Sequence, residues 1–177
     1  MKFLYLATVA FLIFLIVGCS QQQTFEGFFH KKMEQMHMGE KDYSYELVYK
    51  EFNVVHQDDA VAVFKENNKY GDQIFIAYFE KQDNQWSWKQ SSGAEWNSPV
   101  KWSSMNQTPF IYSGTISGNS ISEVYAGNEP AEIIEVEEDK KFWYAISPIE
   151  DVKVMVVKED GTKEIIEEIN YKELSSE

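Results

Sequence analysis

Residues 43–50 read Tyr-Ser-Tyr-Glu-Leu-Val-Tyr-Lys, and this stretch is the clearest indication of a β fold. Large apolar or aromatic side chains stand at every second position, at Tyr43, Tyr45, Leu47 and Tyr49. Successive side chains of a strand point to opposite faces of a sheet, so the alternation predicts a half-buried strand. The alternation slips at Glu51-Phe52, which predicts a bulge or a strand break near residues 50–52.

Strand patterns continue directly after this stretch. Residues 60–65 and 73–81 are rich in apolar side chains, and an Asn-Asn-Lys-Tyr-Gly turn at 67–71 separates them. Residues 73–81 are apolar at both parities, which predicts a central strand buried on both faces. A turn at 82–85 leads into Trp86-Ser-Trp-Lys89. Together these segments predict an antiparallel meander.

Six further short strands are predicted beyond residue 109, with turns every eight to twelve residues. They are Phe110–Ser117, Ile121–Ala126, Ala131–Val136, Lys141–Ser147, Asp151–Lys158 and Thr162–Ile169. Asp160-Gly161 between the last two predicts a tight type I′ hairpin turn. The run Tyr112-Ser-Gly-Thr-Ile-Ser, with Phe142-Trp-Tyr and Val152-Lys-Val-Met-Val, resembles the small Ig-like β modules of bacterial surface proteins. That resemblance implies a small sandwich over this segment.

On the N-terminal side, residues 25–38 predict an amphipathic helix. Thr24 can cap it, Gly39 can end it, and one face carries Phe25, Phe29, Met33 and Met36. The irregular residues 91–109 are the expected boundary between two subdomains. We therefore expect a mainly β chain: a helix and a meander over 25–109, then an acidic, Ig-like β-sandwich over 110–177.

The first 24 residues predict export and lipidation. A nearly unbroken apolar run, Phe3–Val17, precedes Ile16-Val-Gly-Cys19, which resembles the lipobox of bacterial lipoproteins. The run is shorter than the ~20 residues of a membrane-spanning helix. The resemblance implies a signal peptide over 1–18, a diacylated Cys19 and a polar tether over 19–24, so the chain would be anchored to the cell membrane outside the cytoplasm. In composition the chain also resembles lipoproteins of low-GC Gram-positive bacteria, while the type of envelope stays open.

Composition excludes several classes of partner and mechanism. Without the signal peptide the chain has 15 Lys, no Arg and 29 acidic residues, so its formal charge is 15 − 29 = −14. Nucleic acid is not an expected partner, because phosphate backbones need basic patches. Cys19 is the only cysteine, so neither a disulfide nor a zinc–thiolate site is expected. The usual hydrolase, nucleotide-binding and metalloprotease motifs are missing, and we expect no cofactor and no enzymatic activity.

The clustered tryptophans are the candidate binding surface. Trp86, Trp88, Trp96 and Trp102 lie within seventeen residues. Such rings mostly serve as core, but exposed indoles can contact a protein or stack on sugar rings. Since residues 91–105 are irregular, Trp96 and Trp102 are expected to be the more exposed pair.

A second candidate site is the run from His30 to Met38. On a helix His30, Met33 and His37 share one side, Met36 neighbours Met33, and imidazole with thioether suits Cu(I). The alternative is that Met33 and Met36 extend the apolar stripe into the core. A weaker candidate for a cation-binding site is the acidic run Glu132, Glu135, Glu137, Glu138 and Asp139. The alternative is that these residues form a solvated strand face.

Taken together, the sequence predicts a lipid-anchored extracytoplasmic envelope protein. We expect a non-enzymatic binding or accessory module, whose partner besides the membrane is an envelope protein or a glycan. The alternative function is copper handling through the segment His30–Met38.

Overall fold

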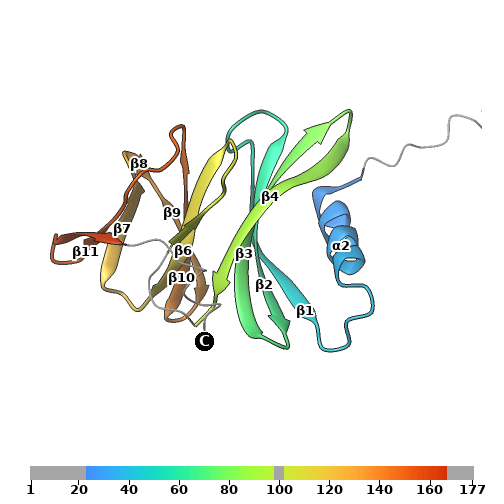
Figure 1. The fold of residues 1–177 in the computed structure, drawn as a ribbon, viewed down its shortest axis with the longest axis horizontal. Helices are drawn as coiled ribbons and strands as arrows, with labels where there is room; N and C mark the ends of the chain where they lie inside the picture. Colours follow the sequence, from blue (N-terminus) through green and yellow to red (C-terminus); the bar gives the residue numbers. More distant parts are fainter. Residues whose placement is uncertain (1–22, 98–101, 167–177) are drawn as a thin grey trace, which may run out of the picture.

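The residues that the structure describes form a stack of four layers, one helix and three β-sheets. The computed structural model describes residues 23–97 and 102–166. Figure 1 shows the helix against a first sheet, with the second and third sheets following in a row. Every strand pair is antiparallel, so the predicted mainly β class is confirmed. Among the described residues no helix is long and apolar enough to cross a membrane.

The helix is α2 (Phe25–Met36). Sheet A has the order β1 (Ser44–Phe52), β2 (Asp59–Asn68), β3 (Gly71–Gln82) and β4 (Gln85–Glu95). Sheet B has the order β5 (Trp102–Ser104), β6 (Phe110–Ser117), β10 (Lys140–Ser147) and β9 (Glu132–Glu137). Sheet C has the order β12 (Lys163–Ile166), β11 (Val154–Lys158), β7 (Ile121–Ala126) and β8 (Glu129–Pro130).

Sheet A is buried on both faces along its central strands. On β3, Ile74 and Ile76 point toward sheet B, whereas Ala77 and Phe79 belong to the cluster under the helix. All four are fully buried. The predicted central strand over 73–81 is therefore confirmed, because residues of both parities have an apolar layer to pack against.

Helix α2 covers the outer face of sheet A. The side-chain oxygen of Thr24 accepts a hydrogen bond from the backbone N–H of Gly27 at 3.1 Å, which caps the first turn. Phe25, Phe29 and Met33 are buried against the sheet. Met36, the last residue of the helix, is 51% exposed, so the expectation that it extends the stripe into the core is wrong.

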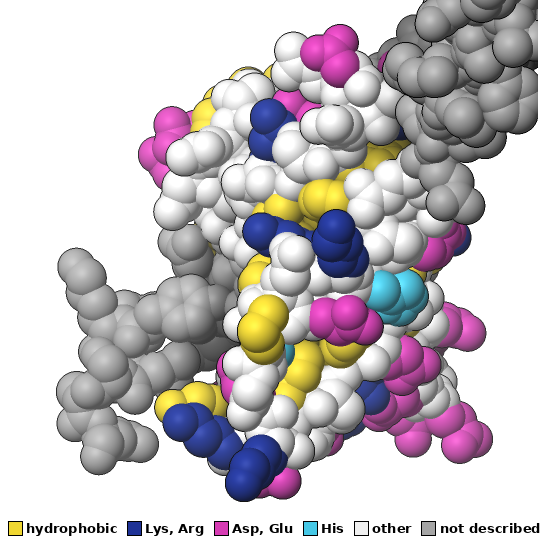
Figure 2. All heavy atoms as spheres, turned by 90° about the vertical axis from the view of Figure 1, so that its right-hand side faces the viewer, with side chains coloured by type: hydrophobic (Ala, Val, Ile, Leu, Met, Phe, Trp, Pro, Cys, Tyr) yellow, Lys and Arg dark blue, Asp and Glu magenta, His cyan; other side chains and the backbone are white. Residues whose placement is uncertain are grey.

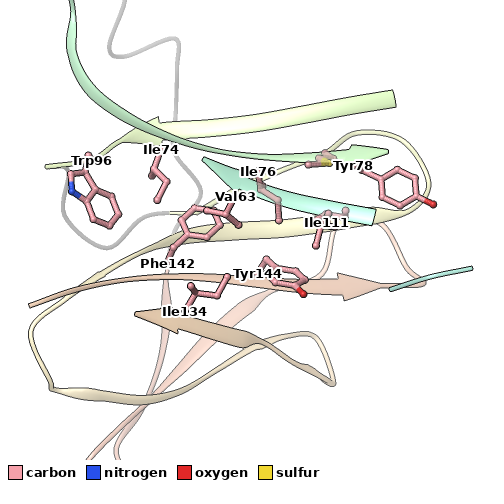
Figure 3. Close-up of a cluster of buried hydrophobic side chains, with 11 residues drawn as sticks. Val63, Ile74, Ile76, Tyr78, Trp96, Ile111, Ile134, Phe142 and Tyr144 are labelled. Carbon is pink, nitrogen blue, oxygen red and sulfur yellow. The ribbon is translucent and has the colours of Figure 1, made fainter. Parts of the chain in front are cut away.

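A second apolar core lies between sheets A and B. Figure 3 shows Val63, Ile76 and Tyr78 of sheet A facing Ile111 and Phe142 of sheet B. Since these residues come from both sides of the boundary expected at 91–109, the two halves share one core. The division into subdomains stays a prediction.

The third core lies between sheets B and C. Trp143 of β10 and Ile116 of β6 pack with Val124, Val154 and Val156 of sheet C. Sheet B is therefore covered on both faces, by sheet A on one side and by sheet C on the other.

One predicted turn is confirmed, and two other predicted irregularities differ in detail from the structure. The bulge in β1 lies between Leu47 and Tyr49, a few residues before the expected position. The β3–β4 turn is a two-residue connection in which Asp83 and Asn84 both have positive φ, the geometry that a type I′ turn requires. The last hairpin forms, but only Gly161 has positive φ there (82°), so the expected type I′ turn at Asp160-Gly161 is wrong.

Candidate functional site

Trp96 and Trp102 are core residues. Trp96 is 2% exposed and lies near the ammonium groups of Lys65 and Lys140, which stand 5.4 and 5.2 Å from its ring centroid. Its indole N–H donates to Glu137 at 3.0 Å, and that of Trp102 donates to the Ile166 carbonyl at 2.8 Å. The expectation that these two form the more exposed pair is wrong, because both rings fill cores and both N–H groups find acceptors within the fold.

Trp86 and Trp88 are half-buried beside α2. Trp86 lies edge-on to Phe25 at 5.1 Å between ring centroids, and Trp88 stacks on Phe29 at 6.2 Å. Both support the helix, and Trp86 additionally lines a surface hollow with Phe52 and Lys81. The four tryptophans therefore do not form one exposed surface.

The four candidate copper ligands have separate surroundings. Met33 is fully buried under the helix, whereas Met36 is half exposed. His30 is exposed and its Nδ1 lies 3.0 Å from the Tyr45 hydroxyl, a hydrogen-bond distance. Because the Met33 thioether is buried and the Met36 side chain is half exposed, the two do not form one coordination sphere. For Met33, packing in the core is confirmed.

His37 belongs to a polar cluster at the C-terminal end of α2. Its ring stacks on Tyr43 with 3.7 Å between centroids, and its Nδ1 lies 3.1 Å from a Glu40 oxygen. Its Nε2 is 3.5 Å from a carboxylate oxygen of Glu66, which is only 7% exposed. Burial raises the pKa of Glu66. Burial, and next the neighbouring Glu66 carboxylate, raise the pKa of Tyr43.

A pocket of about 500 Å³ opens where the three sheets meet. The end of β1, the segment β8–β9 and strand β10 contribute to its walls. Its lining is acidic, polar and partly apolar, and no Lys or His takes part. The lining residues are Glu51, Asn53, Val54, Glu129, Pro130, Ala131, Glu132, Tyr144, Ala145 and Ile146.

Glu51 is held in this pocket by two phenols. Tyr49 donates to Glu51 Oε2 at 2.9 Å, and Tyr144, reaching across from sheet B, donates to the same oxygen. Burial and the hydrogen bond to Glu51 raise the pKa of Tyr49 to about 12 and that of Tyr144 further. Both phenols therefore keep their protons at neutral pH, which makes them donors to the carboxylate rather than bases.

The loop beside the pocket is held by a buried carboxylate. Asp59 is 1% exposed and accepts hydrogen bonds from the backbone N–H groups of Val54 (2.7 Å), Val55 (3.1 Å) and His56 (2.6 Å). The Tyr78 hydroxyl donates to it at 3.0 Å. Asp59 thus fixes the backbone at Val54, a residue that lines the pocket.

The pocket can bind a cationic group. Three acidic residues, Glu51, Glu129 and Glu132, line it and no basic residue does, and Val54 and Ile146 are apolar lining residues. An ammonium or guanidinium group would find charge-assisted acceptors there. Among residues 23–97 and 102–166, no group of three His, Cys, Asp or Glu side chains is arranged to hold a metal ion.

Reasoning from the sequence missed most of this site. Glu132 was part of the acidic run noted above, and the slip at Glu51 marked the end of β1. The pairing of Glu51 with Tyr144 had no signal in the sequence, because the two residues are 93 positions apart. Cys19, the expected lipidation site, lies outside the described residues.

The chain matches no known protein-family model. It also matches no curated protein and no solved structure.

Proposed function

We propose that this chain is a lipid-anchored extracytoplasmic binding module of the bacterial envelope, without a catalytic role. The lipobox-like Ile16-Val-Gly-Cys19 after an apolar run supports the anchoring. The described body begins close to the anchor in the sequence, because Thr24, which caps helix α2, is only five residues after Cys19. Such a chain would reach envelope partners from the membrane surface.

The strand order of sheets B and C supports an Ig-like sandwich as the outer part of this module. If β5 to β12 are lettered in chain order as A, B, C, C′, D, E, F and G, sheet B has the order A-B-E-D and sheet C the order G-F-C-C′. Immunoglobulin-type sandwiches divide their strands between two sheets in this way. Sandwiches of this kind gather their loops at the two ends, where antibody domains bind their ligands. The step from this fold to a binding role is an analogy between folds.

The pocket at the junction of the sheets is the observation that carries the binding role. Its carboxylates have no basic residue within the lining, and one of them, Glu51, is oriented by Tyr49 and Tyr144. A fixed acceptor loses little conformational entropy when a ligand binds. The favoured ligand is an ammonium-bearing group of an envelope protein or glycan.

Titration with butylammonium and with butanoate, followed by backbone amide NMR, tests this role. The cation is expected to shift amides around Glu51, Glu129 and Glu132, while the anion leaves them unchanged. Glu51→Gln keeps the shape and an acceptor oxygen but removes the charge. It should weaken butylammonium binding about tenfold, which corresponds to about 1.4 kcal/mol for a charge-assisted hydrogen bond.

The matched control is Glu34→Gln on the exposed side of α2, which removes one carboxylate from outside the pocket. This variant is expected to bind butylammonium like the parent chain. Equal shifts with cation and anion, or equal weakening in both variants, would show that the pocket does not select a cation.

A further inference from the structure

The hollow beside the N-terminal end of α2 has a composition unlike that of the acidic pocket. Its volume is about 270 Å³, and it is lined by Gln23, Thr24, Phe25, Glu26, Phe52, Lys81 and Trp86. Figure 2 looks onto the α2 side of the molecule, where hydrophobic and Lys side chains lie next to one another in the middle of the view.

Three aromatic rings form one wall of the hollow. Phe25 lies edge-on to Phe52 at 5.4 Å and to Trp86 at 5.1 Å, and Phe52 and Trp86 are 5.9 Å apart. Phe25 is buried, but Phe52 is 41% exposed and Trp86 is half-buried. An exposed Phe beside a partly exposed Trp is an apolar surface that lacks a covering layer among the described residues.

The charges around this wall are paired or have an apolar neighbour. Lys50 pairs with Glu26, and Lys89 pairs with Glu80 at 2.9 Å. The ammonium group of Lys81 lies 5.7 Å from the Trp86 ring centroid. Trp and Lys side chains of this kind keep an apolar part in contact with hydrocarbon and a polar end in water.

The short sequence distance between the hollow and Cys19 points to the membrane as the layer that covers the hollow. Gln23 is four residues after Cys19, so the hollow lies within roughly 14 Å of the residue expected to carry lipid, at ~3.6 Å per extended residue. We propose that Phe52 and Trp86 insert into the interface of the membrane that holds the anchor. This inference rests on the proposed lipidation of Cys19.

The contact does not depend on anionic lipid. Asp83 lies in the turn that follows β3, and the backbone carbonyl of Asp58 accepts from the N–H of Lys81, so both acids stand at this end of sheet A. Their carboxylates offset the attraction of the lysines for anionic headgroups. The aromatic side chains therefore provide the contact, as in the aromatic belts of membrane proteins.

The test uses the full chain, purified from cell membranes and reconstituted into phosphatidylcholine vesicles with plain or brominated acyl chains. Bromine quenches Trp fluorescence on contact. We expect brominated vesicles to remove part of the emission, since one of the five Trp residues is at the interface. The loss should disappear in Trp86→Phe and persist in Trp88→Phe, the same replacement two residues along the strand.

Flotation of the vesicles separates the two proposals. A chain that floats but shows equal emission with plain and brominated lipid would overturn the membrane contact and leave the anchoring intact. A chain that does not float would overturn both. A loss of emission that remains in Trp86→Phe would place the lipid contact elsewhere and overturn the inference.

Phe52→Ser provides a second variant, because this side chain is 41% exposed and stands outside the three buried clusters, although its ring contacts Phe25. It should reduce the quenching while the chain stays folded, with a melting temperature only a few degrees lower through the lost contact with Phe25. The parent chain could instead form a dimer and show no quenching by brominated lipid, with Phe52→Ser turning the dimer into a monomer. In that case the hollow is an interface between two copies, and the membrane contact is wrong.

Discussion

Replacing Asp59 with Asn should release the loop beside the pocket and lower the free energy of unfolding measurably. The carboxylate accepts hydrogen bonds from three backbone N–H groups and from the Tyr78 hydroxyl, and Asp59 is 1% exposed. Asn has the same shape but only one acceptor oxygen, and its amide group would face N–H donors. Some of these donors would then remain buried without an acceptor.

The magnitude follows from the hydrogen bonds lost. A hydrogen bond to a charged group contributes about 1.5–3 kcal/mol, and a buried donor without a partner costs about 1–3 kcal/mol. Because the four bonds share one carboxylate their losses are not additive, and we expect about 2–4 kcal/mol in total. In a chain of this size that corresponds to a melting temperature lower by about 5–15 °C.

Urea unfolding measures this loss directly, with Asp58→Asn as the control. Asp58 is the adjacent residue, is exposed and has a φ of 67°, which Asn tolerates. This control should change the free energy of unfolding by less than about 0.5 kcal/mol. If Asp59→Asn and Asp58→Asn unfold at the same urea concentration, Asp59 does not hold the loop as described.

Three further predictions test the packing and the pH dependence. Met33→Ala should lower the free energy of unfolding by about 2–5 kcal/mol through a cavity under α2, whereas the half-exposed Met36 should tolerate Ala. Equal losses for the two variants in urea unfolding would contradict the finding that Met33 is buried and Met36 is not. Gly93→Ala would place a Cβ 2.2 Å from the Phe75 ring, so a loss of about 1–3 kcal/mol is expected, and an unchanged melting temperature would show that Phe75 does not cover this glycine. Burial raises the pKa of Glu66 above its ordinary value of 4.5, so ionisation of Glu66 destabilises the fold. The parent chain should therefore lose stability relative to Glu66→Gln as the pH rises from 4 to 8. If the melting temperatures of the two chains change in parallel across this range, the burial of an ionised Glu66 has no such effect.

The strands could be predicted from local patterns because each needs only its own alternation and its flanking turns. The predicted bounds of Phe110–Ser117 and Ile121–Ala126 coincide with β6 and β7. The two-sided burial of β3 also followed from its sequence, since a strand that is apolar at both parities must lie between two layers.

The order of the layers and the acidic pocket could not be predicted in this way. Trp96 follows β4 in an irregular, polar segment, yet it is buried because Glu137 and the lysines of other strands surround it. Glu51 and Tyr144 meet only because sheet A packs on sheet B. Contacts between distant residues depend on the stacking of whole sheets, which the period of a single strand does not reveal.

Anchoring through Cys19 is the premise on which the proposed function and the membrane contact both rest. Mass spectrometry of the N-terminal peptide of the protein isolated from cell membranes tests it most directly. We predict a peptide that begins at Cys19 and carries a diacylglyceryl group. A peptide that begins at Met1, or one that contains Cys19 without lipid, would contradict the proposal.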